Sequence, residues 1–260
     1  MSITPLLEKK VDLLQTRIFS SREQMGAAAG LDVAERIQRL LQEQDIVRII
    51  FAAAPSQNEL LAHLANDQRI DWSRIDVFHM DEYIGLAENA IQRFSRFLNN
   101  HLFEKVKPRK VNLILDNDGL AIACARYKEL LLEAPIDIVC LGVGENGHLA
   151  FNDPPVANFK DPEIIKEVTL DDACRQQQVN DGCFPSLHDV PEKALTLTIP
   201  MLLSAKYLYC VAPGKTKQLA INKLMADPIS TACPASILRT HSHCVLYTDK
   251  DGYYLPSCNI

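Results

Sequence analysis

Short apolar segments alternate with longer amphipathic segments along most of this chain, and this order restricts its fold more than any other feature of the sequence. The apolar segments are rich in Val, Ile and Leu, as buried strands are, and the segments between them repeat apolar residues at helical spacing. Strands that alternate with helices predict a parallel sheet covered by helices on both faces. The expected strands are 46–53, 75–79, 111–115, 136–142, 163–170, 194–199, 207–212 and 244–248, and the expected helices are 57–65, 94–103, 119–132 and 216–225.

Two further segments are less regular than this alternating pattern. Ser20 and Glu23 have the spacing of a capping box, which predicts a helix that reaches about Gln44 and is preceded by an extended piece. The polar segment 171–191 has no clean periodicity, so it is interpreted either as irregular surface or as part of a mobile lid within 155–191. No linker-like or repeated segment divides the sequence, so a single domain over residues 1–260 is expected.

Charge and composition disfavour several classes of protein. A formal net charge of −6 argues against a nucleic-acid partner, because binding to the phosphate backbone needs clustered Lys and Arg. The first residues lack a signal-peptide pattern and no run of roughly 18 apolar residues occurs, so we expect no membrane partner and a cytoplasmic location. The eight cysteines have no C-x-x-C spacing, which favours reduced thiols. His241 and His243 lie near cysteines without paired spacing, so no metal site is expected.

The segment 141–154 follows a predicted strand and reads Leu-Gly-Val-Gly-Glu-Asn-Gly-His-Leu-Ala-Phe-Asn-Asp-Pro. Its G-x-G-x-x-G spacing matches a dinucleotide-binding turn, but two prolines follow at once and prevent the long helix that such a turn must open. His148 comes after this glycine turn at the carboxyl end of a strand, where open α/β sheets bind ligands. Either Glu145 or Asp153 is placed to orient its ring, which makes His148 a candidate for proton transfer to or from a sugar ring oxygen.

A second polar group follows the predicted strand 75–79, in the sequence Met80-Asp81-Glu82-Tyr83. Adjacent residues of a strand point to opposite sides, so at most one of the two carboxylates is expected to face a pocket. We favour Asp81, as a general base that removes a proton next to a carbonyl group. Burial in a cleft raises the pKa of such a carboxyl from about 4 towards neutrality, where a base works best.

Two loops between a strand and a helix are candidates for binding a phosphate group. In segment 52–57 a proline begins a helical turn, so backbone N–H groups and the Ser56 hydroxyl are available to an anion. Segment 213–217 reads Pro-Gly-Lys-Thr-Lys and lacks the spacing of a Walker A loop, which disfavours a nucleoside triphosphate. Lys217 and Arg175 are the expected charge partners of the phosphate.

Segments 80–86 and 144–154 resemble the two signature motifs of the glucosamine-6-phosphate deaminase (isomerase) family, and the similarity covers nearly the whole chain in order and spacing. The resemblance implies a three-layer α/β/α, Rossmann-like fold with a mainly parallel central sheet, shared with 6-phosphogluconolactonases and some bacterial sugar-phosphate sensors. It also implies conversion of glucosamine 6-phosphate to fructose 6-phosphate and ammonia, with a phosphorylated amino sugar as partner and no metal or organic cofactor. The sequence leaves a homo-oligomer open.

The resemblance assigns roles to individual residues. Asp81 corresponds to the general base that moves a proton from C2 to C1 of the sugar, and His148 to the residue that assists ring opening. Asn146 and Asp153 stand where well-known members carry Asp and Glu, so the local negative charge around His148 is expected to be smaller here. The expected substrate- and phosphate-binding residues are Ala54, Ser56, Gln57, Glu82, Gly147, the lid arginine Arg175 and the phosphate-binding lysine Lys217.

Three alternative functions stay open. The phosphate loop has Ala and Pro where the family has Gly and Thr, and a changed loop and lid are compatible with the galactosamine epimer as substrate. A 6-phosphogluconolactonase shares the implied fold, but both motifs follow the deaminase pattern. A non-catalytic sugar-phosphate sensor usually carries an added helix-turn-helix, whereas only about 45 residues precede the first predicted sheet strand. The presence of Asp81 and His148 favours catalysis.

Overall fold

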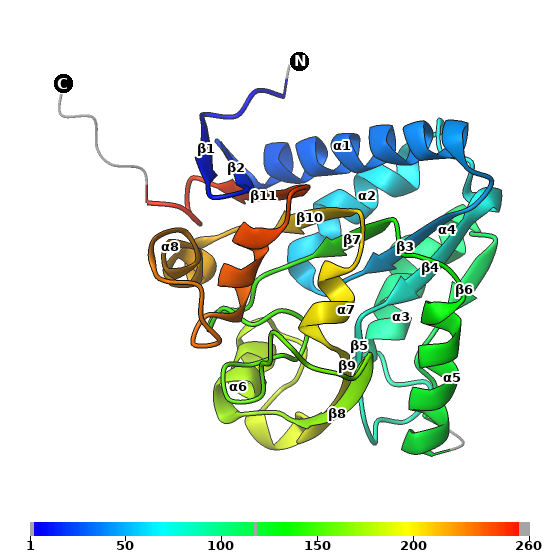
Figure 1. Ribbon diagram of the computed structural model, residues 1–260. Coiled ribbons are helices and arrows are strands. Elements are labelled where there is room, and N and C mark those ends of the chain that lie inside the picture. The colour runs from blue at the N-terminus through cyan, green and yellow to red at the C-terminus, as the bar shows by residue number, and fades with distance from the viewer. Residues whose placement is uncertain (1–2, 117–118, 255–260) are drawn as a thin grey trace.

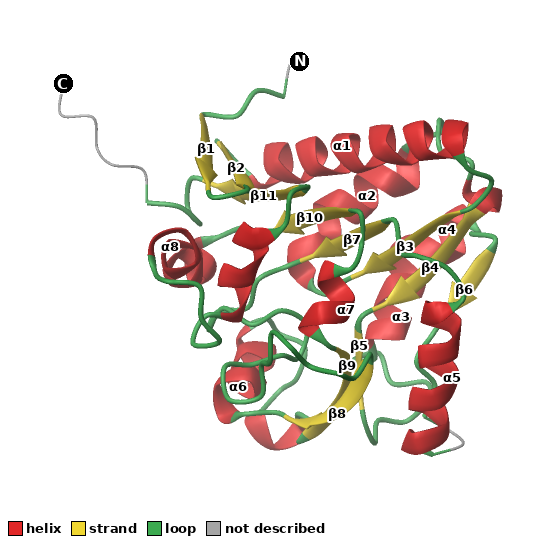
Figure 2. Ribbon diagram, viewed as in Figure 1, coloured by secondary structure: helices red, strands yellow, loops and turns green. Residues whose placement is uncertain are grey.

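The computed structural model describes residues 3–116 and 119–254 (Figures 1 and 2). An eight-stranded sheet runs through it in the order β1-β2-β11-β10-β7-β3-β4-β6. Neighbouring strands from β2 to β6 are parallel, whereas β1 runs antiparallel to β2. The strands are β1 (Leu7–Val11), β2 (Leu14–Phe19), β3 (Val47–Phe51), β4 (Ile75–His79), β6 (Lys110–Asn112), β7 (Ile138–Leu141), β10 (Tyr207–Val211) and β11 (Cys244–Asp249).

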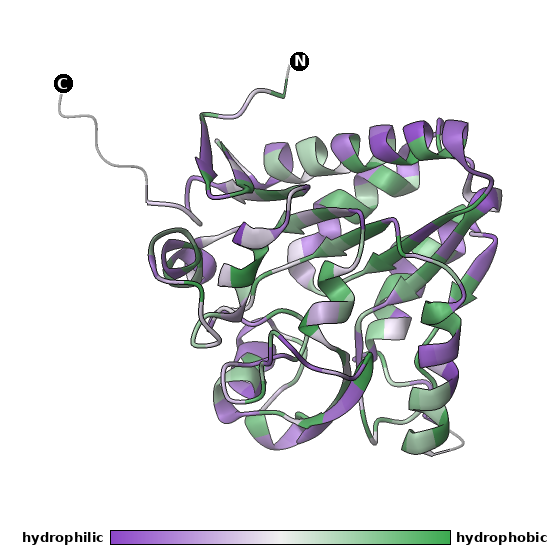
Figure 3. Cartoon of the chain, in the orientation of Figure 1, coloured by the Kyte–Doolittle hydropathy of each residue, from purple (hydrophilic) through white to green (hydrophobic). Residues whose placement is uncertain are grey.

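Successive residues of the central strands point to opposite faces of the sheet and build two hydrophobic cores. In β3, Ile49 and Phe51 pack in the core that includes residues of α1 and α2, while Ile50 packs in the core that includes residues of α5, α7 and α8. Figure 3 shows the central strands as mainly hydrophobic and the helices as two-sided. The predicted parallel sheet between two helical layers is therefore confirmed. The helices of these layers include α1 (Arg22–Glu43), α2 (Asn58–Asn66), α5 (Leu120–Leu132), α7 (Ile199–Leu203) and α8 (Gln218–Ala226).

A smaller antiparallel sheet lies beside the carboxyl end of β4 (Figure 1). After Met80 the chain leaves the main sheet, and the Met80 carbonyl accepts a hydrogen bond of 2.8 Å from the backbone N–H of Leu197. This turn places Asp81 at the junction of the two sheets. The predicted strands 163–170 and 194–199 both form, but in this smaller sheet. Its strands, in order, are β5 (Asp81–Tyr83), β9 (Lys193–Leu197) and β8 (Ile165–Thr169).

The N-terminal elements differ from the prediction in two respects. The N-cap of α1 is Ser21, whose hydroxyl accepts a hydrogen bond of 3.3 Å from the backbone N–H of Gln24. The helix therefore begins one residue later than the spacing of Ser20 and Glu23 predicted. The expected extended piece is a hairpin of β1 and β2, and β2 joins the main sheet as a parallel neighbour of β11.

Segment 171–191 contains a helix that its sequence pattern does not predict. The helix α6 (Asp172–Asn180) is capped by Asp171, whose carboxylate accepts a hydrogen bond of 2.7 Å from the backbone N–H of Cys174. The predicted helix 94–103 is divided, since α3 (Phe94–Leu98) leads through a π-helical turn into α4 (Glu104–Val106). In the described part of the chain, no helix is long and apolar enough to span a membrane.

Candidate active site

A cavity of about 540 Å³ lies at the carboxyl ends of three neighbouring strands, β10, β7 and β3. The loops after these strands form much of its wall, together with the start of β5 and residues from α6. In open α/β sheets this edge is where ligands bind. Several residues that the sequence singled out lie on the wall, namely Asp81, His148, Ala54, Ser56, Gln57 and Lys217.

The turn after β7 folds His148 back over Gly144. The backbone N–H of Gly144 donates a hydrogen bond of 3.0 Å to the His148 carbonyl. A Cβ atom on Gly144 would lie 2.2, 2.3 and 2.4 Å from Cε1, Nε2 and Nδ1 of the ring, so the imidazole rests directly on this glycine. Gly147 adopts a φ of +88°, and a Cβ there would lie 2.7 Å from the Cys233 sulfur. Gly147 therefore shapes the turn and does not lie on the cavity wall, contrary to its expected place.

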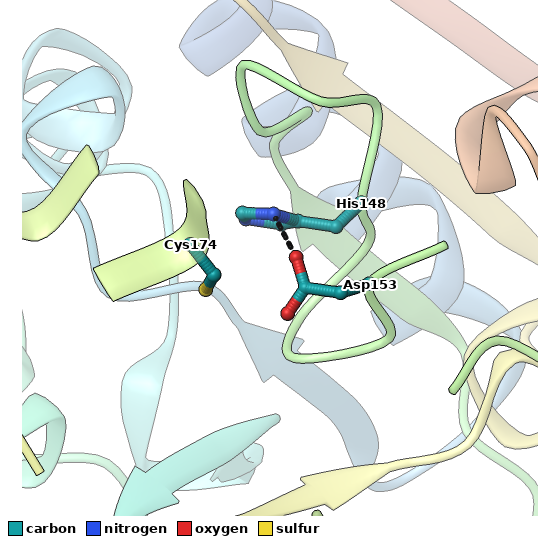
Figure 4. A group of neighbouring side chains, drawn as sticks. All are labelled: His148, Asp153 and Cys174. Carbon is teal, nitrogen blue, oxygen red and sulfur yellow. Dashed lines mark ion pairs between the residues drawn. The ribbon is translucent and has the colours of Figure 1, made fainter. Parts of the chain in front are cut away.

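Asp153 and Asn146 both contact His148, and Asp153 is one of the two carboxylates that the sequence offered for orienting the ring (Figure 4 shows Asp153 beside it). Asp153 Oδ1 lies 2.9 Å from His148 Nδ1 and accepts a hydrogen bond of 2.8 Å from Asn146 Nδ2. Asn146 Oδ1 accepts a hydrogen bond of 3.0 Å from the His148 backbone. Burial raises the pKa of Asp153, but the contacts with His148 and Asn146 outweigh it and lower the pKa below the ordinary value. An ionised Asp153 thus orients the imidazole.

Asp81 has the environment that a general base requires. It is the first residue of β5, is 7% exposed and lies on the cavity wall. Burial raises its pKa well above the ordinary value, and the neighbouring Glu82 raises the pKa further. The carboxylate therefore binds a proton more tightly than an exposed aspartate does, which suits proton abstraction near neutral pH.

Glu82 points away from the cavity, as the alternation of a strand requires for one of the two carboxylates. It accepts hydrogen bonds of 3.1 Å from the backbone N–H of Phe94 and 3.0 Å from that of Ser95. The Ser95 hydroxyl donates a third, of 2.6 Å. Glu82 therefore attaches α3 to β5, and it does not lie on the cavity wall, although it was expected among the substrate-binding residues.

A cationic part of the wall lies next to the start of a helix. The loop after β3 supplies Ala54, Ser56 and Gln57, and this loop leads through a 3-10 turn into α2. Lys217 follows β10 and is 6% exposed, and burial lowers the pKa of its amine. A buried ammonium group has lost contact with water, so a nearby anion stabilises its charge more than it would stabilise an exposed one. This part of the cavity is therefore suited to a phosphate group.

Arg175 lies on α6 but not on the cavity wall. Its guanidinium donates hydrogen bonds of 2.9 Å to the Leu187 carbonyl and 3.1 Å to the Val190 carbonyl. It also forms an ion pair of 3.3 Å with Asp172. In this arrangement Arg175 ties α6 to the residues that follow it, so its predicted position beside the substrate is not observed.

Arg22 and Gln177 are among the wall residues that the sequence did not single out. Arg22, the first residue of α1, donates a hydrogen bond of 2.7 Å to Glu59 and another to the Pro55 carbonyl. A positive charge in the first turn of a helix interacts unfavourably with the helix dipole. This unusual position was the feature of the sequence that could have identified Arg22 as a candidate functional residue. Gln177 accepts a hydrogen bond of 2.8 Å from the backbone N–H of Glu145, which joins α6 to the glycine turn. Gln177 was missed because α6 itself was not predicted.

The described cysteines and the His241–His243 pair lie outside the arrangement described above, apart from Cys174, Cys183 and Cys233. The described cysteines are free thiols. His241 Nε2 lies 2.9 Å from the Ala205 carbonyl. Within residues 3–116 and 119–254, this histidine pair belongs to no group of metal-ligating side chains.

Comparisons with known proteins agree with these observations. The family model for glucosamine-6-phosphate isomerases and 6-phosphogluconolactonases matches residues 20–247. A glucosamine-6-phosphate deaminase of Lactobacillus delbrueckii subsp. bulgaricus is 32% identical over 203 residues, which are 76% of this chain and 83% of that protein. The deaminase of Staphylococcus epidermidis is 30% identical over 240 residues, which are 88% of this chain and 95% of that protein.

Solved structures show the same similarity. A monomeric glucosamine-6-phosphate deaminase superposes with a TM-score of 0.82 at 29% identity, covering 91% of this chain and 98% of that one. A 6-phosphogluconolactonase from Thermotoga maritima superposes with a TM-score of 0.75 at 20% identity, covering 93% and 100%, which shows a shared fold. The chain is therefore an enzyme that belongs to the family of glucosamine-6-phosphate isomerases and 6-phosphogluconolactonases.

Proposed function

We propose that this enzyme converts glucosamine 6-phosphate and water to fructose 6-phosphate and ammonia. The observation that carries the proposal is that Asp81, His148 and Lys217 are all buried and lie on the wall of one cavity. A base, an oriented imidazole and a cation for the phosphate are the groups that this reaction needs. The names of the relatives at 30% and 32% identity support the same reaction.

Ring opening is the first step of the proposed reaction. His148 takes the proton of the C1 hydroxyl and delivers it to the ring oxygen, and the C1–O bond to that oxygen breaks to give an aldehyde. Asp153 keeps the imidazole in place from Nδ1, at 2.9 Å, during this transfer. The other ring nitrogen, Nε2, is left to act on the substrate because His148 lines the cavity.

Isomerisation and loss of ammonia follow. Asp81 takes the proton from C2 while a water molecule gives a proton to O1, which yields an enolamine. Asp81 then returns a proton to C1, and this leaves an imine at C2. Water adds to that imine, and ammonia leaves as the C2 carbonyl of fructose 6-phosphate forms. A buried carboxylate whose pKa is raised fits this double role, because it must accept a proton and give it back.

Residues 155–191 act in this proposal as a lid over the substrate. The helix α6 places Gln177 and Gln178 on the cavity wall, and the hydrogen bond from Glu145 to Gln177 joins this segment to the glycine turn. Arg175 is held by carbonyl groups of the same segment. A shift of α6 on substrate binding would free Arg175 to reach the ligand.

Release of ammonia from the purified full-length chain tests the proposed function. Glucosamine 6-phosphate and galactosamine 6-phosphate are supplied in parallel, and fructose 6-phosphate is detected with a coupling enzyme in the first case. Ammonia from glucosamine 6-phosphate is the expected result. Hydrolysis of 6-phosphogluconolactone without release of ammonia from either amino sugar would contradict the proposal, as would binding of the amino sugars without turnover.

The variant Lys217→Ala is expected to raise KM for the phosphorylated substrate by about 10- to 100-fold, because a hydrogen bond to a charged group contributes roughly 1.5–3 kcal/mol. Lys215→Ala is the matched control, since Lys215 comes from the same loop and lies on the same wall but is exposed. We expect a rise of about fivefold at most from this control. Steady-state kinetics measures both, and equal effects of the two variants would argue against a special role for the buried lysine.

A further inference from the structure

His148, Asp153 and Cys174 form a compact group of potential metal ligands beside the cavity (Figure 4). One ring nitrogen, one carboxylate oxygen and the thiol sulfur all lie within 4.8 Å of one another. His148 and Asp153 come from the loop after β7, whereas Cys174 comes from α6, and Figure 4 shows the thiol on the side of the carboxylate. The three side chains therefore meet only because α6 packs against this loop.

All three side chains of this group are buried, and the Asp153 carboxylate interacts with each of the other two. The exposed fractions of His148, Asp153 and Cys174 are 8%, 1% and 1%. Asp153 Oδ1 contacts Nδ1 of His148 and Nδ2 of Asn146, and the Cys174 thiol is the remaining described group that interacts with the buried carboxylate. A thiol is a weak hydrogen-bond donor, so a cation that binds the carboxylate and the sulfur, and releases the thiol proton, would be a stronger partner for this buried carboxylate.

The chemistry of the three donors selects a class of ion. Imidazole, carboxylate and thiolate together are the ligands of Zn²⁺ and of ions that replace it, such as Co²⁺. Mg²⁺ and Ca²⁺ prefer sets of oxygen ligands, so a site with sulfur and nitrogen disfavours them. Three protein ligands leave one tetrahedral position for water or a substrate oxygen.

We propose that His148, Asp153 and Cys174 bind a thiophilic divalent cation, represented by Zn²⁺, and that this ion inhibits the enzyme. Inhibition follows from the geometry if the proposed function holds, because the ion would take the ring nitrogen that Asp153 now orients. The imidazole would then turn away from the position that ring opening requires. Binding of the ion, in contrast, depends only on the three ligands and not on which reaction the enzyme performs.

Absorption spectroscopy of the untagged, full-length protein with Co²⁺ tests the binding. A sulfur-to-cobalt charge-transfer band is expected in the wild type and should be lost in Cys174→Ser. Cys183→Ser is the matched control, because Cys183 lies on the wall of the same cavity but belongs to no ligand group in the described chain, and it should keep the band. No band in the wild type, or a band that survives in Cys174→Ser, overturns the proposal.

A second variant separates loss of the site from loss of the fold. Asp153→Asn keeps the thiol and the shape of the side chain but removes the carboxylate charge, so it should weaken Co²⁺ binding by more than about tenfold without abolishing the sulfur band at saturation. Circular dichroism and thermal denaturation show whether each variant is folded. Unchanged Co²⁺ affinity in folded Asp153→Asn would also contradict the proposal.

Inhibition is tested in the ammonia-release assay with Zn²⁺. The wild type and Cys183→Ser should be inhibited at the concentrations at which Zn²⁺ displaces Co²⁺, and a chelator should restore their activity. Cys174→Ser should need at least about tenfold more Zn²⁺ for the same fractional inhibition. Equal sensitivity of Cys174→Ser and the wild type would refute inhibition through this site. If no amino sugar is turned over, the proposed function fails while the cobalt spectra still decide the binding.

Discussion

Replacing Asp81 by Asn should lower the turnover number for glucosamine 6-phosphate by roughly 10²- to 10⁴-fold, which is the contribution of a positioned acid–base group. Asparagine keeps the shape and the hydrogen-bonding capacity of the side chain but does not accept the proton from C2. Substrate binding should persist, because the proposed phosphate contacts, Ser56 and Lys217, lie elsewhere on the wall. Steady-state assays of ammonia give the rate, and calorimetric titration gives the affinity.

The control for this variant is Asp181→Asn, which makes the same chemical change on the wall of the same cavity. Asp181 follows α6 as its C-cap residue and is not part of either sequence motif, so its replacement should change turnover by about threefold or less. Similar large losses in both variants would show that negative charge in the cavity, and not a base at Asp81, limits the reaction.

Asp81→Asn should also stabilise the fold, and the size of the effect should depend on pH. Burial raises the pKa of Asp81 in the folded protein above its value in the unfolded chain. The protonated form of Asp81 therefore stabilises the folded state at low pH. This stabilisation is lost as the pH rises from the pKa of the unfolded chain to the raised pKa of the folded protein, by about 1.4 kcal/mol for each pH unit between the two. Thermal denaturation should show Asp81→Asn melting above the wild type near pH 8 and the gap closing at lower pH. A gap that does not vary with pH would contradict a raised pKa.

The fold was predictable from the sequence where burial imposes a simple pattern. The strand 75–79 is buried at every residue, and its limits agree with those predicted from its apolar residues. The hairpin of β1 and β2 was not, because β1 is a charged edge strand with the sequence Leu-Glu-Lys-Lys-Val. The helix α6 was missed for a related reason, since its polar sequence has no apolar stripe and its ends depend on the cap at Asp171.

The candidate site was predictable where a single strand end determines the direction of a side chain. Asp81 and Glu82 diverge as neighbours in a strand must, and the sequence favoured the one that lies on the cavity wall. The position of Arg175 depends instead on how α6 packs and on the carbonyl groups of Leu187 and Val190, which no local pattern reveals. The contact between the His148 ring and Gly144 likewise depends on the shape of the whole turn, which brings residue 148 back against residue 144.

The variant Gly144→Ala should reduce turnover nearly as much as His148→Asn, by roughly 10²- to 10⁴-fold. A methyl group at this position would lie 2.2–2.4 Å from three atoms of the imidazole, which is far inside contact distance. The backbone of Gly144 is held by its hydrogen bond to the His148 carbonyl, so the ring has to move away. The measurement is kcat of the purified variant in the ammonia-release assay, after its fold has been checked by circular dichroism.

Two comparisons show whether displacement of the ring is the cause. Gly142→Ala changes the same turn, but the added methyl group would have Gln57 Nε2 at 3.0 Å as its nearest neighbour and not the imidazole, so its loss of turnover should be at least tenfold smaller. The double variant of Gly144→Ala and His148→Asn should be no slower than His148→Asn alone, because there is no imidazole left to displace. Additive losses in that double variant would mean that Gly144 acts on catalysis by a route that does not pass through His148.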